Sequence, residues 1–241
     1  MNSNEQHIVS AFDRDLEAVQ AHIMKMGGLV ETAILDAAQA LAALDEELAE
    51  TVRRADREID GLEQEIQSRA ALMIAERQPV ASDLRIVLAA MKIASNLERI
   101  GDYAKNMAKR TGVLAGMRPV EDEGASMRRM AKMVEVMLKD ALDAFMQRDG
   151  ELAGDVLQRD IEVDQMYNSI FRNYLTYMME DPRNITACMH LHFIAKNIER
   201  MGDHVTAIAE QTIYLVTGQM PDGDRPKQEA AMGVVSGVDN R

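Results

Sequence analysis

The stretch SNLERIGDYAKN at residues 95–106 is matched about a hundred residues later by KNIERMGDHVTA at residues 196–207. Both segments carry Asn, an aliphatic residue, Glu, Arg, an apolar residue, Gly and Asp in the same order. A second alignment places residues 26–60 over residues 130–164 without a gap, and 14 of these 35 positions are identical. The chain is therefore a tandem duplication, and two similar halves are expected.

The composition favours helices in both halves. Of the 241 residues, 47% are hydrophobic and only 4% are aromatic, and the few Gly and Pro residues lie mostly between long periodic stretches. Near the first motif, apolar residues recur in alternating steps of four and three, as on a helix face that packs into a core. That row is Ile86, Ala90, Ile93, Leu97, Ile100, Ala104 and Met107. The sequence predicts an all-α protein of two tandem antiparallel three-helix bundles.

Turn residues divide each half into three expected helices, and Asp45 is the predicted N-cap of the second helix. The first repeat is expected over residues 1–114, a linker over 115–123, and the second repeat over 124–217. The tail at 218–241 contains Gly, Pro and Asp with little apolar content, and we expect it to be disordered. The expected helices cover about residues 6–44, 46–76, 79–112, 124–147, 150–180 and 184–217.

Charge and cysteine content restrict the function. The formal net charge is −13, so no nucleic-acid partner is expected, whereas cations or basic protein surfaces are. The single Cys188 rules out an internal disulfide and is predicted to be a small core residue. The N-terminal residues lack the segments of a signal peptide, and no uncharged run approaches the ~20 apolar residues of a membrane span. We expect a cytoplasmic protein without membrane insertion.

Two pairs of acidic residues in each half are expected to meet. In the first half, Asp56 and Asp60 lie four residues apart on one helix, and Glu98 and Asp102 do so on the next. The pairs are centred 20 and 22 residues from the turn near residue 78. Because both helices rise about 1.5 Å per residue, antiparallel packing brings the pairs to one level. The second half repeats the arrangement with Asp160, Asp164, Glu199 and Asp203.

Four carboxylates at one level repel each other, and a cation is the simplest remedy. Carboxylate oxygens suit magnesium, calcium or manganese, and iron is also acceptable. Two alternatives stay open. Arg99 and Arg200 could neutralise part of the charge without metal, and a single acidic pair on a helix is most often a solvated face. Because the acids lie off the apolar rows, we expect the sites on the bundle surface, open to solvent or to a partner.

The glycines of the repeated motif indicate crowding. Gly101 and Gly202 fall inside expected helices, where each costs about 1 kcal/mol relative to Ala. That cost predicts the close approach of a neighbouring helix or of a ligand shell.

The remaining sequence contains no catalytic motif. No HExxH, Gly-rich phosphate loop or GxSxG segment occurs, and no phosphate pocket is apparent, so tight binding of free phosphate is not expected. His204 is disfavoured as a metal ligand because the first half has Tyr103 at that position. His190 and His192 are expected at the surface or an interface. A second apolar row suits a dimer contact and consists of Leu84, Leu88 and Met91.

The duplicated motifs resemble those of the PhoU family of phosphate transport system regulatory proteins. The resemblance rests on DREIDGLEQEI (56–66), NLERIGDYAKNMAKR (96–110), DIEVD (160–164) and NIERMGDHVTAIAE (197–210). It implies a PhoU-like fold of spectrin-like antiparallel bundles and a cytoplasmic regulator that is not an enzyme. The resemblance also implies that this regulator is a homodimer and that it represses the phosphate-starvation response when phosphate is plentiful. Its implied partners are the ATPase subunit of the phosphate-specific ABC transporter and a sensor histidine kinase, with peripheral association at the membrane.

The same resemblance implies metal ions on the acidic motifs. Iron or zinc is expected, with magnesium or manganese as further candidates. The implied ligands are Asp56, Asp60, Glu98, Asp102, Asp160, Asp164, Glu199 and Asp203. Two other functions compete with this interpretation. A carboxylate-bridged metalloenzyme would need an open coordination position and a substrate pocket. A purely structural helical adaptor would leave the acids merely solvated.

Overall fold

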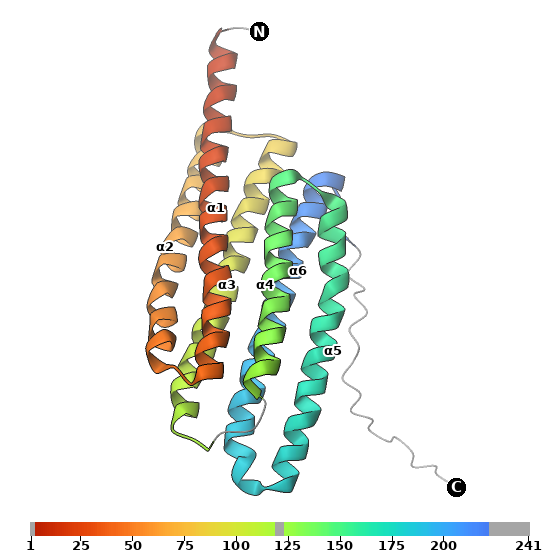
Figure 1. The fold of residues 1–241 in the computed structure, drawn as a ribbon. Coiled ribbons are helices and arrows are strands. Elements are labelled where there is room, and N and C mark those ends of the chain that lie inside the picture. The colour runs from red at the N-terminus through yellow and green to blue at the C-terminus, as the bar shows by residue number, and fades with distance from the viewer. Residues whose placement is uncertain (1–2, 119–122, 222–241) are drawn as a thin grey trace, which may run out of the picture.

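A computed structural model of the chain describes residues 3–118 and 123–221, and six α-helices account for most of them (Figure 1). The middle of the predicted linker and most of the tail predicted to be disordered lie outside the described residues. The all-α prediction of two three-helix units is confirmed. The elements are α1 (Ser3–Ala43), α2 (Glu46–Arg77), α3 (Ser82–Ala115), α4 (Glu123–Gln147), α5 (Gly150–Glu180), a short 3-10 helix η1 (Pro182–Asn184) and α6 (Ile185–Thr217).

Local chemistry sets where the second helix of each half begins. Asp45 has the extended backbone of an N-cap residue, and its carboxylate accepts the backbone N–H of Leu48 at 2.9 Å, as predicted. Asp149 occupies the equivalent position before α5 and accepts two backbone N–H groups of the first turn. Both caps satisfy donors that have no partner within the helix itself.

The third helix ends later than predicted. The expected end was near Gly112, but α3 continues to Ala115. Leu114 is buried in the core, and its burial offsets the roughly 1 kcal/mol that a glycine costs inside a helix. At its other end α3 begins at Ser82, after a turn in which Ala81 has a positive φ of 49°.

Equivalent helices of the two halves face each other. Consecutive helices run antiparallel, with α2 and α5 at the two outer edges of the bundle (Figure 1). Between them, α1 packs against α4 and α3 packs against α6, and each of these pairs is also antiparallel. The halves are thus related by an approximate two-fold axis across the helices, and one hydrophobic core runs through both.

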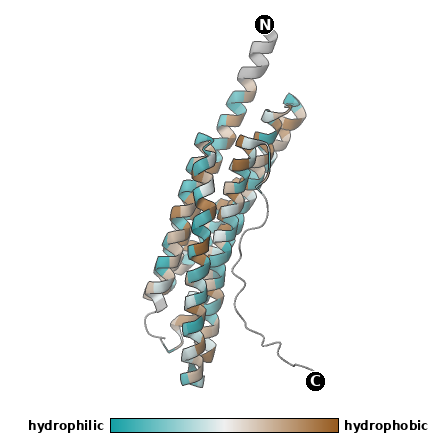
Figure 2. Cartoon of the chain, turned by 90° about the vertical axis from the view of Figure 1, so that its right-hand side faces the viewer, coloured by the Kyte–Doolittle hydropathy of each residue, from teal (hydrophilic) through white to brown (hydrophobic). Residues whose placement is uncertain are grey.

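Each helix buries one face, and hydrophobic and hydrophilic residues alternate along the helices accordingly (Figure 2). The predicted row on α3 is buried throughout, and Ile93, Leu97 and Ile100 have no exposed surface. Cys188 on α6 is buried in the core, as predicted.

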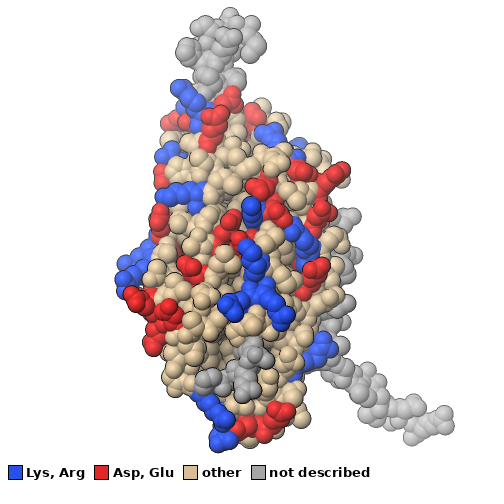
Figure 3. All heavy atoms as spheres, viewed as in Figure 1, with Lys and Arg blue, Asp and Glu red and all other residues tan. Residues whose placement is uncertain are grey.

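The surface mixes both signs of charge. Acidic and basic side chains are interspersed on the face seen in Figure 3, with a small group of basic ones near its centre. Several large apolar side chains are also exposed, including Leu88, Ile185 and Met189. Among the helices of the described ranges, none combines the length and the apolarity needed to cross a lipid bilayer.

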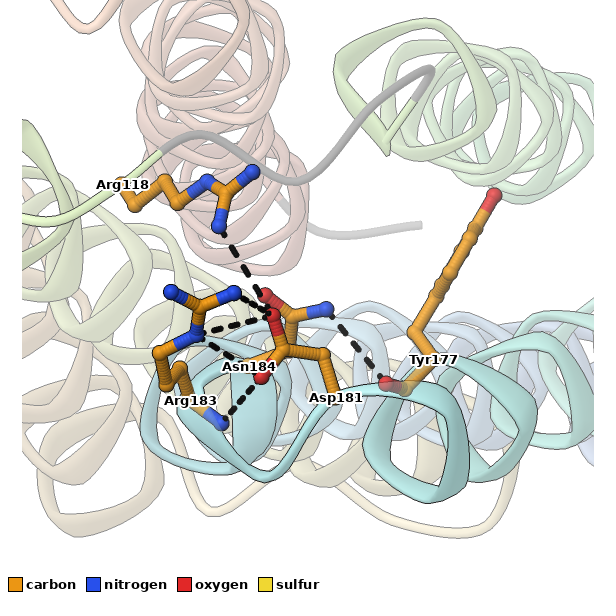
Figure 4. A network of polar contacts seen from close by, with 5 residues as sticks. All are labelled: Arg118, Tyr177, Asp181, Arg183 and Asn184. Carbon is orange, nitrogen blue, oxygen red and sulfur yellow. Dashed lines mark hydrogen bonds and ion pairs between the residues drawn. The ribbon is translucent and has the colours of Figure 1, made fainter.

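Polar contacts fix the turn between α5 and α6 (Figure 4). The carboxylate of Asp181 accepts the backbone N–H of Arg183 and is held by its guanidinium at 2.8–3.0 Å. These hydrogen bonds lower the pKa of Asp181 to about 2. Arg118, in the connection after α3, lies 3.7 Å from the same carboxylate, and the Asn184 amide donates to the carbonyl of Tyr177. Arg118 therefore pairs with this turn.

Candidate functional site

In the first half, the acidic side chains gather around a lysine of the chain itself. Asp56 and Asp60 come from α2, and Glu98 and Asp102 come from α3. The ammonium of Lys105 forms an ion pair with Asp56 and another, at 3.0 Å, with Asp102. One lysine therefore links α2 to α3 at the level where the two acidic pairs were predicted to meet. We call Asp56, Asp60, Glu98 and Asp102 the first acidic set.

Asp56 is the most deeply buried member of this set. Its exposed fraction is 3%, and its Oδ1 has no hydrogen-bond partner among the described residues. The expectation of carboxylates on the bundle surface is wrong for Asp56 and for its equivalent Asp160, which is 8% exposed. The reason is helix geometry: Asp56 lies between Val52 and Ile59 on α2, and both of these neighbours point into the core.

Burial and repulsion raise the pKa values of Asp60 and Glu98. Burial raises the pKa of Asp60, and repulsion from Asp56 raises it further. Burial likewise raises the pKa of Glu98, with repulsion from Asp102 as the next cause. The hydrogen bond to Asp56 raises the pKa of Lys105, so its ammonium stays charged. Lys105 thus places one fixed positive charge between Asp56 and Asp102.

The second half has no lysine at the equivalent position. Three residues after Asp203 comes the uncharged Thr206, whose hydroxyl donates to the backbone carbonyl of Asp203 at 2.8 Å. A different lysine, Lys196, contacts Glu199 at 2.7 Å. Glu199 Oε2 is buried without a hydrogen-bond partner in the part of the chain that the structure describes. Burial raises the pKa of Glu199, and repulsion from Asp203 and Asp164 adds to this. We call Asp160, Asp164, Glu199 and Asp203 the second acidic set.

The motif glycines lie where the neighbouring helix approaches. A methyl group at Gly101 would lie 3.1 Å from the side chain of Ile59, and one at Gly202 would lie 2.8 Å from a carboxylate oxygen of Asp160. The predicted crowding is therefore caused by side chains of α2 and α5. In the second half, the buried aspartate itself occupies the space that a side chain at Gly202 would need.

The eight predicted residues form two sets, but their role as metal ligands stays a prediction. Within residues 3–118 and 123–221, no three His, Cys, Asp or Glu side chains lie close enough together to hold a metal ion as they stand. Lys105 was missed by the sequence analysis, although its spacing of three residues from Asp102 was a usable signal.

The arginines of the two motifs behave differently. Arg99 lies 3.6 Å from Glu98 and so neutralises part of the first set, as the sequence allowed. Arg200 instead hydrogen-bonds to Tyr103 of the other half, which raises the pKa of its guanidinium. Motif residues therefore serve the contact between the halves as well as the acidic sets.

The histidines belong to helix contacts. His204 Nδ1 lies 2.8 Å from the amide oxygen of Asn96 on α3. His190 lies 3.1 Å from Arg110 of α3, and His192 packs beside the ring of Phe171 on α5. Both side chains are half-buried in contacts between helices of the same chain.

When the chain is compared with known protein families, the same family model matches each of its two halves. A family model described as PhoU domain matches residues 23–111 and again residues 127–212. The phosphate-specific transport system accessory protein PhoU homolog of Rhizobium meliloti is 46% identical over 223 residues, covering 92% of this chain and 94% of that protein. The homolog of the same name from Caulobacter vibrioides is 46% identical over 222 residues, covering 92% and 96%.

Solved structures agree with these sequence relatives. The crystal structure of PhoU from Pseudomonas aeruginosa is 41% identical, with a TM-score of 0.82, and the match covers 86% of this chain and all of that one. The phosphate transport system regulatory protein PhoU from Streptococcus pneumoniae is 30% identical, with a TM-score of 0.81 and coverage of 88% and 99%.

Proposed function

The chain belongs to the PhoU family, and on that basis we propose that it is an accessory regulator of phosphate transport. In this proposal it represses phosphate uptake and the phosphate-starvation response when phosphate is plentiful. The observation that carries it is the match of residues 23–111 and 127–212 to PhoU domains, together with 46% identity to a phosphate transport accessory protein over 92% of the chain. The names of these relatives also support a regulator that is not itself an enzyme.

We further propose that the protein couples the ATPase subunit of the phosphate-specific ABC transporter to a sensor histidine kinase. A coupling protein needs two docking surfaces that respond to each other. Two equivalent halves sharing one continuous core suit that task, because closely packed side chains can pass a displacement in one half to the other. The proposed location is the cytoplasm, with peripheral association at the membrane complex.

The regulatory proposal is tested in the organism that encodes the protein. Deleting the gene should switch on a phosphate-starvation reporter in phosphate-rich medium, and restoring the intact gene should silence it again. A reporter that stays silent in the deletion strain would contradict the proposal.

Metal binding by the acidic sets is a separate proposal. Iron or zinc is the proposed ion, and the carboxylate oxygens also suit manganese or magnesium. Support for an ion at the second set comes from Glu199, which has a buried oxygen without a hydrogen-bond partner among the described residues, and from Asp160, which is 8% exposed. Asp160, Asp164, Glu199 and Asp203 would hold the ion, which would neutralise these acids and cross-link α5 to α6. Elemental analysis of freshly purified protein tests this, and replacing these four residues with Ala should remove the metal.

We also propose a homodimer formed through the outer apolar row on α3. Leu88 is 44% exposed, and Met189 at the equivalent place on α6 is 40% exposed. Contiguous exposed apolar side chains mark protein interfaces. In this proposal, Leu88 and Met189 are the exposed apolar side chains that the two subunits bury against each other.

A further inference from the structure

We propose that a groove between α4 and α5 is a docking site for an acidic segment of a partner protein. The segment inserts one large apolar side chain beside Met133 and Met137 and places a carboxylate against Arg159. The inference rests on the proposed coupling role and deepens it, because it assigns a position and a partner chemistry to one of the docking surfaces that coupling needs.

The groove has the size of an anchor site. It encloses about 250 Å³, and its lining comes from α4 and α5 alone: Lys132, Met133, Val136, Met137, Arg159 and Glu162. Pockets that hold a whole small molecule measure about 300–1,000 Å³, so this groove suits a single large side chain better than a cofactor. Val136 is 37% exposed, and flexible methionine side chains adapt to apolar anchors of different shape.

Arg159 provides donors for a carboxylate in the groove. Its Nη2 donates to Asp140 of α4 at 2.7 Å, whereas its Nε is buried without a hydrogen-bond partner in the described part of the chain. A buried donor without a partner is unfavourable, and the planar guanidinium matches the shape of a carboxylate. Because the side chain is 34% exposed, a carboxylate of the bound segment can reach it and form a charge-assisted hydrogen bond.

Further positive charge lies beside the groove on α4. Arg128 precedes Lys132 by one helical turn, and Arg129 is its neighbour. Among the described residues, the polar side-chain contacts of these two arginines are with neutral groups, those of Gln39 and Ser126. Helix α4 runs through the middle of the view in Figure 1, and basic side chains gather near the centre of the same face in Figure 3. In a chain of net charge −13, this surface attracts acidic partners.

The first half does not repeat these cations. By the repeat offset of 104 residues, Lys132 corresponds to Gly28 and Arg159 corresponds to Ala55. Small neutral residues thus stand where the second half has its lysine and arginine. The charge of the groove is therefore a property of the second half and not of the repeated fold, which lets the two halves bind different partners.

A polypeptide fits this surface better than a continuous polyanion does. Glu162 lines the groove and repels a dense row of phosphates, as in nucleic acid or an anionic lipid surface. A polypeptide places its carboxylates one at a time, so it can meet Arg159 and the α4 cations while it avoids Glu162. An acidic segment with one apolar anchor satisfies both the charge and the apolar lining of the groove.

Photocrosslinking of the full-length protein in its own cells tests the inference. The photoreactive p-benzoylphenylalanine replaces Val136 in the groove, and mass spectrometry maps the crosslinked segment in phosphate-rich and phosphate-poor medium. We expect a protein segment of net negative charge with at least one large apolar residue. Thr32 is the equivalent position on α1, so the same probe there is the matched control and should not crosslink to that segment.

Charge reversal then tests the role of the cations. Lys132→Glu should lower the yield of the Val136 crosslink about tenfold or more, because it sets like charges against each other. Replacing an acidic residue of the mapped segment with Lys should restore the yield. Arg129→Glu breaks no ion pair within the described residues, so it keeps the test open if Lys132→Glu does not fold.

A second control separates the groove from net charge. Lys109→Glu makes the same change of charge on α3, which within the described ranges packs against neither α4 nor α5, and should leave the yield unchanged. A neutral or basic segment, a crosslink to lipid or nucleic acid, equal yields from Val136 and Thr32, or no crosslink in either medium would overturn the inference. The gene-deletion reporter is independent of these results, so a reporter that responds while Val136 gives no crosslink removes the docking site alone.

Discussion

Tyr103 and His204 occupy equivalent positions in the two halves, and their rings meet across the contact between α3 and α6 with a centroid distance of 5.7 Å. Contact between equivalent residues marks the approximate two-fold axis of the molecule. Each follows directly on the last acid of its motif, Asp102 or Asp203. The repeated segment thus has two tasks, because one side of it builds an acidic set and the other joins the halves.

The first prediction concerns pH and His204. Burial lowers the pKa of His204 below its usual 6.5, and Arg99 and Arg200 act in the same direction against Asp203. Below pH 6.5 the unfolded chain takes up a proton that the folded protein resists, so this residue's contribution to the free energy of unfolding is lost as the pH falls. Because the ring is only partly buried, we expect a loss of less than about 1 kcal/mol.

Urea unfolding of wild type and His204→Gln between pH 5 and 8 measures this contribution. The difference between the two proteins should change between pH 6.5 and 5 and stay constant above pH 7.5. The Asn96 amide nitrogen donates to the carbonyl of Lys92, which leaves its oxygen to accept from His204 Nδ1. A stability difference independent of pH would mean that His204 is protonated equally in both states.

The second prediction concerns the cap of α5. Asp149 accepts the N–H groups of Glu151 and Leu152 at 2.9 and 3.0 Å. Asp149→Ala should therefore lower the free energy of unfolding by about 1 kcal/mol, whereas Asp149→Asn, which keeps a capping oxygen, should lose less. Chemical denaturation followed by circular dichroism checks the order. An alanine variant as stable as the asparagine variant would show that the cap contributes little.

The sequence predicted the elements of the fold better than their meeting points. Periodic apolar residues and capping residues such as Asp45 are local signals, so the helices were found almost to their ends. The level of the acidic pairs also followed, because the rise of a helix is constant. The sequence did not predict that α3 packs against α6, since the repeat offset says nothing about how two copies dock. It also did not predict that Asp56 is buried and held by Lys105, which depends on how α2 is rotated against α3.

The third prediction concerns phosphate itself. The chain carries a net charge of −13, and its two repeated motifs gather carboxylates, which repel phosphate. Calorimetry with inorganic phosphate and metal-free protein should give no binding in the micromolar range. Micromolar binding under these conditions would require an anion site elsewhere, and the regulator would then sense phosphate directly and not through its partners.

The fourth prediction concerns the dimer. Leu88→Glu places a charge at the exposed member of the apolar row on α3 and should weaken self-association, because an unpaired charge is costly inside an apolar contact. Sedimentation velocity should show a shift from dimer towards monomer at the same concentration. Met189→Glu, at the equivalent position of α6, tests whether the second half takes part. If neither change alters the sedimentation of a dimeric wild type, the contact lies on another face.

The fifth prediction explains why the motif contains glycine. In Gly202→Ala the new methyl group would lie 2.8 Å from the buried Asp160 carboxylate, so the Asp160 side chain or one of the two helices must shift. Overpacking of this kind typically costs 1–3 kcal/mol, and it should exceed the gain of up to about 1 kcal/mol that alanine brings to a helix. Gly154→Ala on α5 is the matched control, because nothing lies within 4 Å of its added methyl group, and it should stabilise the protein. Gly101→Ala should fall between them, since the side chain of Ile59 at 3.1 Å can move more readily than a buried carboxylate. Urea denaturation of the three variants gives the order directly, and a Gly202→Ala protein as stable as Gly154→Ala would show that Asp160 can leave its buried position without loss.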